Sequence, residues 1–231
     1  MWGVPMRVVT SFGIRAAMAC VALFPIAAMA DEPEIGRTPA IGVGISTLGI
    51  TAELSYRVIG NLVVRLNGNW ADLGYDQAVE GNTFNGTARV QGAGLIADWH
   101  PFANGFRLSG GARYHDAVFS GTFSGSDVEL NGQTYTAAQY GTLTARVENE
   151  AKFAPYAGIG WDSSHFSESG FSIGVEAGVL FVGEQKATLT SSKTVAGLQA
   201  DLDAEVSKVK SDYGRYGEMW PVLSLAAKYR F

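Results

Sequence analysis

The sequence predicts an all-β protein: an eight-stranded antiparallel transmembrane β-barrel with one amphipathic helix in its last long connection. Three observations predict this class. Apolar and polar residues alternate along several segments of about ten residues, which is typical of strands with two different faces. After residue 30, no apolar run reaches the roughly 18 residues of a helical membrane span. The connections between the expected strands are also alternately short and long.

Residues 1–30 have the order of a secretory signal peptide. Arg7 and Arg15 are basic, the segment has no acidic residue, and an apolar run from Ala16 to Ala27 precedes Ala28-Met29-Ala30. This run of about a dozen residues is too short to span a bilayer, so we expect cleavage after Ala30. Cys20 lies inside the apolar run, and its position argues against a lipoprotein processing site.

Residues 31–231 form one expected domain, the barrel. Removing residues 1–30 takes away two of the 17 basic residues and none of the 22 acidic ones, which leaves a formal charge of −7. It also removes Cys20, the only cysteine, so no disulfide is expected. The acidic balance, without any basic cluster, excludes nucleic acid as an expected partner.

The strands follow from the alternation. They are expected at 40–46, 48–58, 62–70, 88–100, 106–115, 152–162, 171–183 and 220–231. Ile41 and Val43 occupy odd positions, whereas the apolar set that begins at Leu48 occupies even ones. Such a phase change needs a turn or a bulge. The pattern leaves open whether 40–58 is two strands or one bulged strand, and a turn gives the even number usual for these barrels.

The two faces of the strands favour a membrane barrel over a water-soluble sandwich, which would also alternate. One face is apolar and uncharged, and the other mixes Gly, Ser and Ala with Glu, Arg and Lys, as expected of lipid contact outside and a narrow lumen inside. The aromatic residues expected at one membrane interface are Trp70 and Tyr114, and those at the other are Tyr56, Trp99, Trp161 and Tyr229.

The connections predict the topology. The connections at 59–61, 101–105 and 163–170 are short or moderate, and those at 71–87, 116–151 and 184–219 are long. Short turns are periplasmic and long loops external in such barrels, so both termini are expected in the periplasm. The three long loops are the candidate contact regions for an external ligand or protein.

The last long loop contains the expected helix, residues 194–213. Its apolar residues recur every three or four positions, on one helical face: Val195, Leu198, Leu202, Val206 and Val209. Such a stripe needs a cover. The favoured cover is the protein itself, with the helix across the barrel mouth or against the 116–151 loop; the alternatives are a partner protein and the membrane surface.

Ionisable residues are expected inside the barrel. By parity they are Glu53, Arg57, Arg65, Asp98, Arg107, Arg113, Lys152, Glu176, Lys228 and Arg230. Mixed signs in a narrow interior predict ion pairs that fill the lumen, because eight strands leave room only for side chains. A selective pore is the alternative interpretation.

His165-Phe166-Ser167, with Glu168 next to it and Glu176 further on, resembles the catalytic set of outer-membrane lipid A deacylases. There Ser167 would be the nucleophile, His165 its base and Glu176 the orienting group. The motif lies in a Ser-, Glu- and Gly-rich turn on the expected periplasmic side, whereas the deacylase substrate is in the outer leaflet. A solvated turn is therefore favoured, and no catalytic residues are assigned.

Neither a cofactor nor a metal ion is expected. The histidines after residue 30 (His100, His115 and His165) lie on three separate segments without ligand spacing. Gly42, Gly44 and Gly49 do not have the spacing of a nucleotide-binding loop.

Three segments resemble a family of small proteobacterial outer-membrane barrels. They are Ala97 to Phe102, Ala154 to Trp161, and Trp220 to the last residue, Phe231. This resemblance implies a location in the outer membrane, contact with its lipid, and recognition of Tyr229 and Phe231 by the barrel assembly machinery. It implies no catalytic residues. We expect a structural or surface-interaction role; a narrow solute channel and a lipid A-modifying enzyme are the alternatives.

Overall fold

The computed structural model describes residues 39–79, 82–102, 104–163 and 169–231. The expected signal peptide lies outside the described residues. In chain order the elements are β1 (Ala40–Ser46), β2 (Gly49–Ile59), β3 (Leu62–Val79), β4 (Asn82–Trp99), β5 (Phe106–Ser124), β6 (Val128–Leu130), β7 (Gln133–Tyr135), α1 (Ala137–Tyr140), β8 (Leu143–Asn149), β9 (Phe153–Asp162), β10 (Gly170–Phe181), β11 (Gln185–Ser191), α2 (Leu198–Gly217) and β12 (Met219–Arg230).

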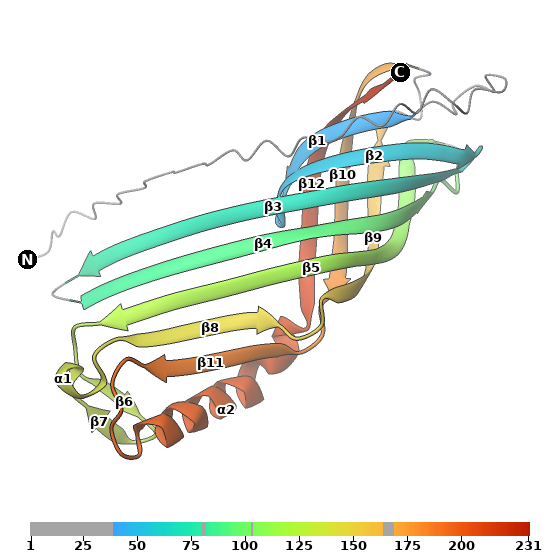
Figure 1. Cartoon of the computed structure of the whole chain (residues 1–231). Coiled ribbons are helices and arrows are strands. Elements are labelled where there is room, and N and C mark those ends of the chain that lie inside the picture. Colours follow the sequence, from blue (N-terminus) through green and yellow to red (C-terminus); the bar gives the residue numbers. More distant parts are fainter. Residues whose placement is uncertain (1–38, 80–81, 103, 164–168) are drawn as a thin grey trace, which may run out of the picture.

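Eight strands close into a ring, as the sequence predicts. Around the ring the order is β1, β2, β3, β4, β5, β9, β10 and β12, and β12 pairs with β1; every neighbouring pair is antiparallel. Figure 1 shows the ring at one end of the molecule. The all-β class and the number of barrel strands are therefore confirmed.

The phase change between Ile45 and Leu48 is a turn, so 40–58 is two strands. Ser46 pairs with Gly49, and the Ser46 hydroxyl accepts a hydrogen bond from the backbone N–H of Leu48 at 3.1 Å. Gly49 has φ +104°, and a Cβ there would lie 2.3 Å from the carbonyl oxygen of Trp70. A glycine is needed for both reasons. Leu48, expected on the outer face, is instead buried at this turn.

Three strands are much longer than predicted. β3 and β4 form one hairpin that pairs from Leu62–Trp99 to Val79–Asn82, and β5 continues to Ser124. The expected 71–87 loop is therefore mostly paired strand, and the prediction of a long loop there is wrong. Figure 1 shows these strands running beyond the ring, and we call the projecting part, residues 71–79, 82–91, 115–149 and 185–217, the extension.

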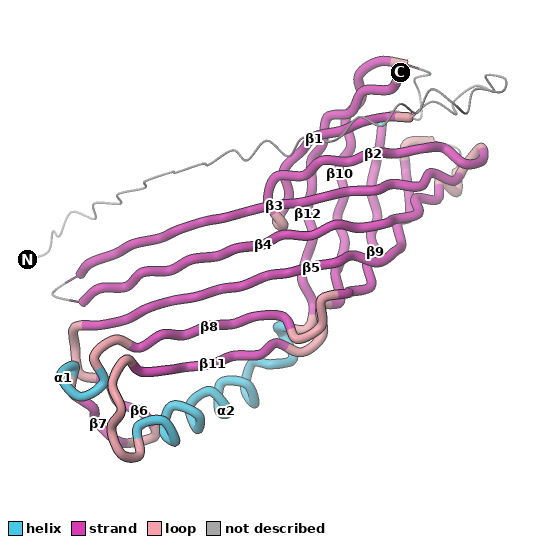
Figure 2. The backbone as a smooth tube through the Cα atoms, in the orientation of Figure 1, coloured by secondary structure: helices cyan, strands magenta, loops and turns pink. Residues whose placement is uncertain are grey.

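The other two long connections also contain strands. β5 pairs with β9 along residues 106–114 and with β8 along residues 118–123, so β8 continues the β9 edge after a bend at 150–152. β10 and β11 are interrupted in the same way at 182–184, where Gly183 has φ +69°. Figure 2 shows the bends as short loops between long strands. Five elements were not expected from the sequence: β6, β7, β8, β11 and α1.

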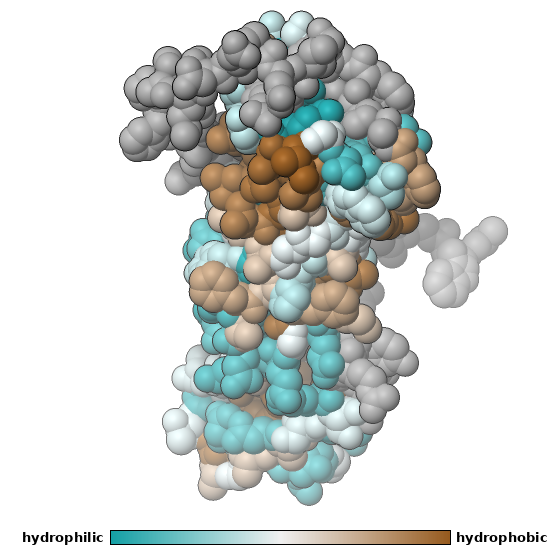
Figure 3. Space-filling model, turned by 90° about the vertical axis from the view of Figure 1, so that its right-hand side faces the viewer, coloured by the Kyte–Doolittle hydropathy of each residue, from teal (hydrophilic) through white to brown (hydrophobic). Residues whose placement is uncertain are grey.

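The faces of the ring are as predicted. Apolar side chains on the outer face are exposed; among them Val43, Leu95, Ile173 and Leu223 are 57–66% exposed. The expected aromatic residues at the end of the ring away from the extension are exposed as well: Tyr56, Trp99, Trp161 and Tyr229. Figure 3 shows hydrophobic residues gathered in one zone of the surface and hydrophilic residues in another.

The polarity of the sheet reverses where the extension begins. In the ring, the inward residues of β5 include Arg107 and Arg113, and the outward ones include Leu108. Beyond Tyr114 the alternation continues, but the inward position 119 is Phe and the outward position 116 is Asp. The extension therefore has an apolar inner face and a polar outer face, the opposite arrangement to the ring.

Helix α2 covers part of that inner face. The predicted 194–213 helix is observed at Leu198–Gly217. Leu198 and Leu202 are fully buried in a cluster with Leu130, Tyr135, Tyr140 and Leu143, which confirms cover by the protein's own 116–151 segment. The protein covers this apolar stripe incompletely, because Val209 is 50% exposed.

Two hydrogen bonds to Asp201 hold the N-terminal part of α2 in place. Tyr135 donates a hydrogen bond to Asp201, and the Asn131 amide donates another at 3.1 Å. These two bonds hold the pKa of Asp201 below its ordinary value, because they stabilise the ionised carboxylate. Among the described residues, no helix is long and apolar enough to cross a membrane.

Candidate functional site: an ion-pair cluster inside the ring

Arg65 on β3 is the centre of a buried charge cluster. Its guanidinium group donates two hydrogen bonds to Asp98 on β4, at 2.9 and 3.0 Å. It also lies 2.5 Å from Glu176 on β10 and 3.4 Å from Glu53 on β2. The planar guanidinium fork suits this arrangement, because one cation can serve several carboxylates in fixed directions.

Two further cations complete the cluster. Arg107 on β5 lies 3.0 Å from Asp162 on β9 and 2.6 Å from Glu176. Lys228 on β12 lies 2.6 Å from both Asp162 and Glu53. Every side chain in these pairs is at most 7% exposed. Three cations and four carboxylates from seven strands thus fill one cross-section of the ring.

Uncharged groups and glycines make the cluster fit. Tyr156 donates a hydrogen bond to Glu176, and Ser109 donates one to Asp98 at 2.6 Å. On β1 the inward position is Gly42, where a Cβ would lie 2.8 Å from the Glu53 side chain. The glycines and serines of the polar face therefore leave the space that the long charged side chains occupy.

Most of the predicted inward charges point into the ring. Glu53, Arg65, Asp98, Arg107, Glu176 and Lys228 form the cluster, and Arg113 and Arg230 are buried on the same face. Arg57 is partly buried.

Lys152 is the exception. It precedes β9, and its ammonium group lies 2.7 Å from Asp116 on the outward face of β5. The prediction that Lys152 points into the lumen is wrong because the chain bends at 150–152 between β8 and β9.

Sequence reasoning missed two members of the cluster, Asp162 and Tyr156. Both occupy even positions of the 152–162 segment, the same parity as Ala154, which is buried inside the ring. Because strand residues two apart share a face, parity alone assigns them inward.

A second polar layer lies on the extension side of the cluster. Arg113 is 5% exposed and donates a hydrogen bond to the side-chain oxygen of Asn69 at 2.7 Å. Among the described residues no carboxylate lies within ion-pair distance of it. The ring of His115 packs edge-on against Trp220, with 5.2 Å between the ring centroids.

The possible catalytic set is not assembled in the part of the chain described. His165, Ser167 and Glu168 lie outside the described residues. Glu176, the candidate orienting group, has its carboxylate bound by Arg65, Arg107 and Tyr156. Among the described residues, no group of three or more His, Cys, Asp or Glu side chains is placed to hold a metal ion.

The chain is similar to two solved structures from Acinetobacter baumannii. It is 21% identical to CarO2 and 19% identical to CarO, with TM-scores of 0.60 and 0.58; each match covers 87% of this chain and 100% of the other. Ail, the attachment invasion locus protein of Yersinia pestis, is 12% identical with a TM-score of 0.39, over 84% of this chain and 94% of Ail. The two CarO structures show that the fold is shared.

No family model matches this chain, and no curated protein matches it.

Proposed function

We propose that this chain is an integral outer-membrane β-barrel with a structural or surface-interaction role and no catalytic activity. The observation that carries the proposal is the reversal of sheet polarity. The ring is apolar and uncharged outside and charged inside, and the extension is polar outside and apolar inside. A ring whose outer face meets lipid, continued by a sheet in water, accounts for both halves.

The position of the reversal supports the expected membrane boundary. Trp70 and Tyr114, the aromatic residues expected at one interface, lie directly before it, and Asp72 and Asp116 follow on the same face. Arg89 pairs with Asp72 at 3.3 Å on that polar outer face. The extension is then the part outside the cell. Signal-peptide cleavage after Ala30 and recognition of Tyr229 and Phe231 by the assembly machinery stay predictions.

The topology is tested by labelling single cysteines on intact cells with a membrane-impermeant maleimide. Gln133→Cys lies in the extension and Asn61→Cys in the turn between β2 and β3; both side chains are exposed. We expect labelling at 133 and none at 61, with labelling at both after the cells are broken. Labelling of intact cells at 61 alone would overturn the topology.

We also propose that the lumen is closed. The buried cluster supports this, because an ion that crosses the ring would have to separate pairs that lie 2.5 to 3.0 Å apart. Protein reconstituted in planar bilayers should give no steady single-channel current. Reproducible conductance that changes with Arg113→Ala would instead establish the narrow channel, since Arg113 is the buried cation nearest the extension side.

A further inference from the structure

We propose that the inner face of the extension binds one uncharged, apolar small molecule, in a cavity of about 420 Å³ that lies on the face of the sheet formed by β4, β5, β8 and β11. The inference deepens the proposed function and rests on it, because it names the ligand class of the external surface. We call this cavity the extension pocket. Cavities of a few hundred Å³ are the usual size for small-molecule sites.

The register of four strands builds the extension pocket. Gly86, Gly121, Ala145 and Leu189 are successive partners in one row across the sheet. The row on one side pairs Phe84 with Phe123 and Leu143, and the row on the other side pairs Phe119 with Val147. Because the middle row begins with two glycines and an alanine between bulky rows, the sheet surface is hollowed there.

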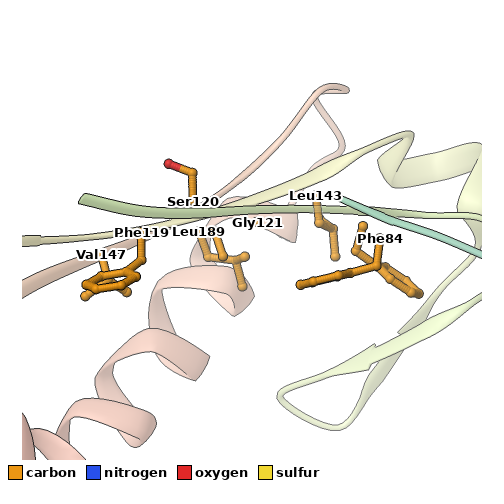
Figure 4. Close-up of a pocket in the computed structure, with 9 residues that line it drawn as sticks. Phe84, Phe119, Ser120, Gly121, Leu143, Val147 and Leu189 are labelled. Atoms are coloured by element: carbon orange, nitrogen blue, oxygen red, sulfur yellow. The ribbon is translucent and has the colours of Figure 1, made fainter. Parts of the chain in front are cut away.

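The walls of the pocket are apolar. Figure 4 shows the side chains of Phe84, Phe119, Leu143, Val147 and Leu189 on the side of the sheet where α2 lies, and that of Ser120 on the opposite side. No charged residue is among those that line the cavity. A charged or strongly polar ligand would lose its hydration without gaining a partner here. The ligand is therefore uncharged and apolar.

The protein itself covers only one end of this face. Leu198 and Leu202 of α2 pack on Leu143, whereas Phe84 at the other end stays 43% exposed. Figure 4 shows the helix on the same side of the sheet as the apolar side chains, but no residue of α2, β6 or β7 lines the hollow. A hollow between the two rows of bulky side chains fits a small molecule better than the flat face of a second sheet. Burial of its apolar surface would supply about 25 cal/mol per Å².

Gly121 provides a way to fill the pocket without moving its walls. A Cβ at this position would lie 3.5 Å from the Phe84 ring, which is ordinary van der Waals contact. Gly121→Val therefore places a side chain in the hollow, and Ala145→Leu does so from the next strand. Thr122→Val is the matched control, because residue 122 lies on the opposite face of the same strand and does not line the hollow.

The experiment titrates N-phenyl-1-naphthylamine, an uncharged fluorescent probe, into full-length mature protein in phosphatidylcholine nanodiscs, with protein-free nanodiscs as background. We expect saturable fluorescence for the natural chain and for Thr122→Val. The Kd should rise at least about tenfold for Gly121→Val and Ala145→Leu, provided both keep the heat-modifiable mobility of a folded barrel. The charged analogue 8-anilino-1-naphthalenesulfonate should bind at least about tenfold more weakly.

Three results would overturn the proposal: no saturable binding above background, equal Kd in all four proteins, or tight binding of the sulfonate. A dimer in analytical ultracentrifugation that Gly121→Val abolishes would assign the pocket to a second copy instead. Cysteine labelling keeps the two proposals apart. Surface labelling at residue 133 without probe binding removes only the pocket, and probe binding without surface labelling removes only the location.

Discussion

Replacement of Arg65 by methionine should lower the free energy of unfolding by about 3–5 kcal/mol, because it leaves buried carboxylates without their central cation. Arg65 contacts Asp98, Glu176 and Glu53, and these side chains are 2–7% exposed. Methionine keeps much of the length and apolar contact of the arginine stem. The loss therefore reports the charge and its hydrogen bonds rather than an empty space.

The measurement is urea unfolding of the refolded barrel in lipid vesicles, followed by tryptophan fluorescence. Arg89→Met is the matched control. Arg89 lies on the next strand and also pairs with a carboxylate, but its side chain is 63% exposed and Asp72 is 42% exposed. An exposed pair contributes at most about 1 kcal/mol. Equal effects of the two substitutions would show that the inner cluster does not stabilise the ring.

Leu202→Asp should unfold the α2 side of the extension while the ring stays folded. Leu202 is fully buried among Leu130, Tyr140 and Leu198, so the change removes apolar contact and places a carboxylate where no cation is described. Buried leucine truncation alone costs about 2–5 kcal/mol, and an unpaired buried charge adds to this. We expect the extension to become sensitive to trypsin at Lys208 and Lys210.

Val209→Asp is the control for this experiment. Val209 belongs to the same apolar stripe but is 50% exposed, so its replacement should leave the trypsin pattern nearly unchanged. Limited proteolysis of whole cells, read by the sizes of the fragments, distinguishes the two variants. Unchanged proteolysis of Leu202→Asp would contradict the packing of α2 on the 116–151 segment. The exposed end of the stripe would then become the better candidate for partner contact.

The two experiments should affect different parts of the molecule. The cluster around Arg65 lies inside the closed ring, whereas Leu202 lies in the extension, where β8 pairs with β5 and β11, and α2 packs on β11. Because distant sites without shared partners act independently, the variant with both substitutions should show both effects: the lower free energy of unfolding of Arg65→Met and the trypsin sensitivity of Leu202→Asp. The extension is thus expected to unfold while the ring stays folded.

The sequence by itself determined the eight ring strands and which face of each strand meets the lumen. Period-two alternation carries that information because, within the ring, one face of every strand is uncharged and the other carries the charges in every strand except β1. A shift of one residue would expose Arg65 or Asp98 on the apolar side. The phase change before Leu48 could equally be a bulge, and only the pairing of Ser46 with Gly49 decided for a turn.

Tertiary structure decided the extension and the partners of each charge. Residues 71–79 and 82–87 continue to alternate, but their apolar positions lie on the other face, so the pattern of the ring strands ends at Trp70. The short β8 and β11 have a strand conformation only because β5 offers them an edge beyond the bend at 150–152. Parity placed Arg107 and Glu176 inside, but the closure of the ring brought them within 2.6 Å of each other across 69 residues of chain. Face is a local property of a strand, whereas contact across a barrel depends on register and closure, which no single segment encodes.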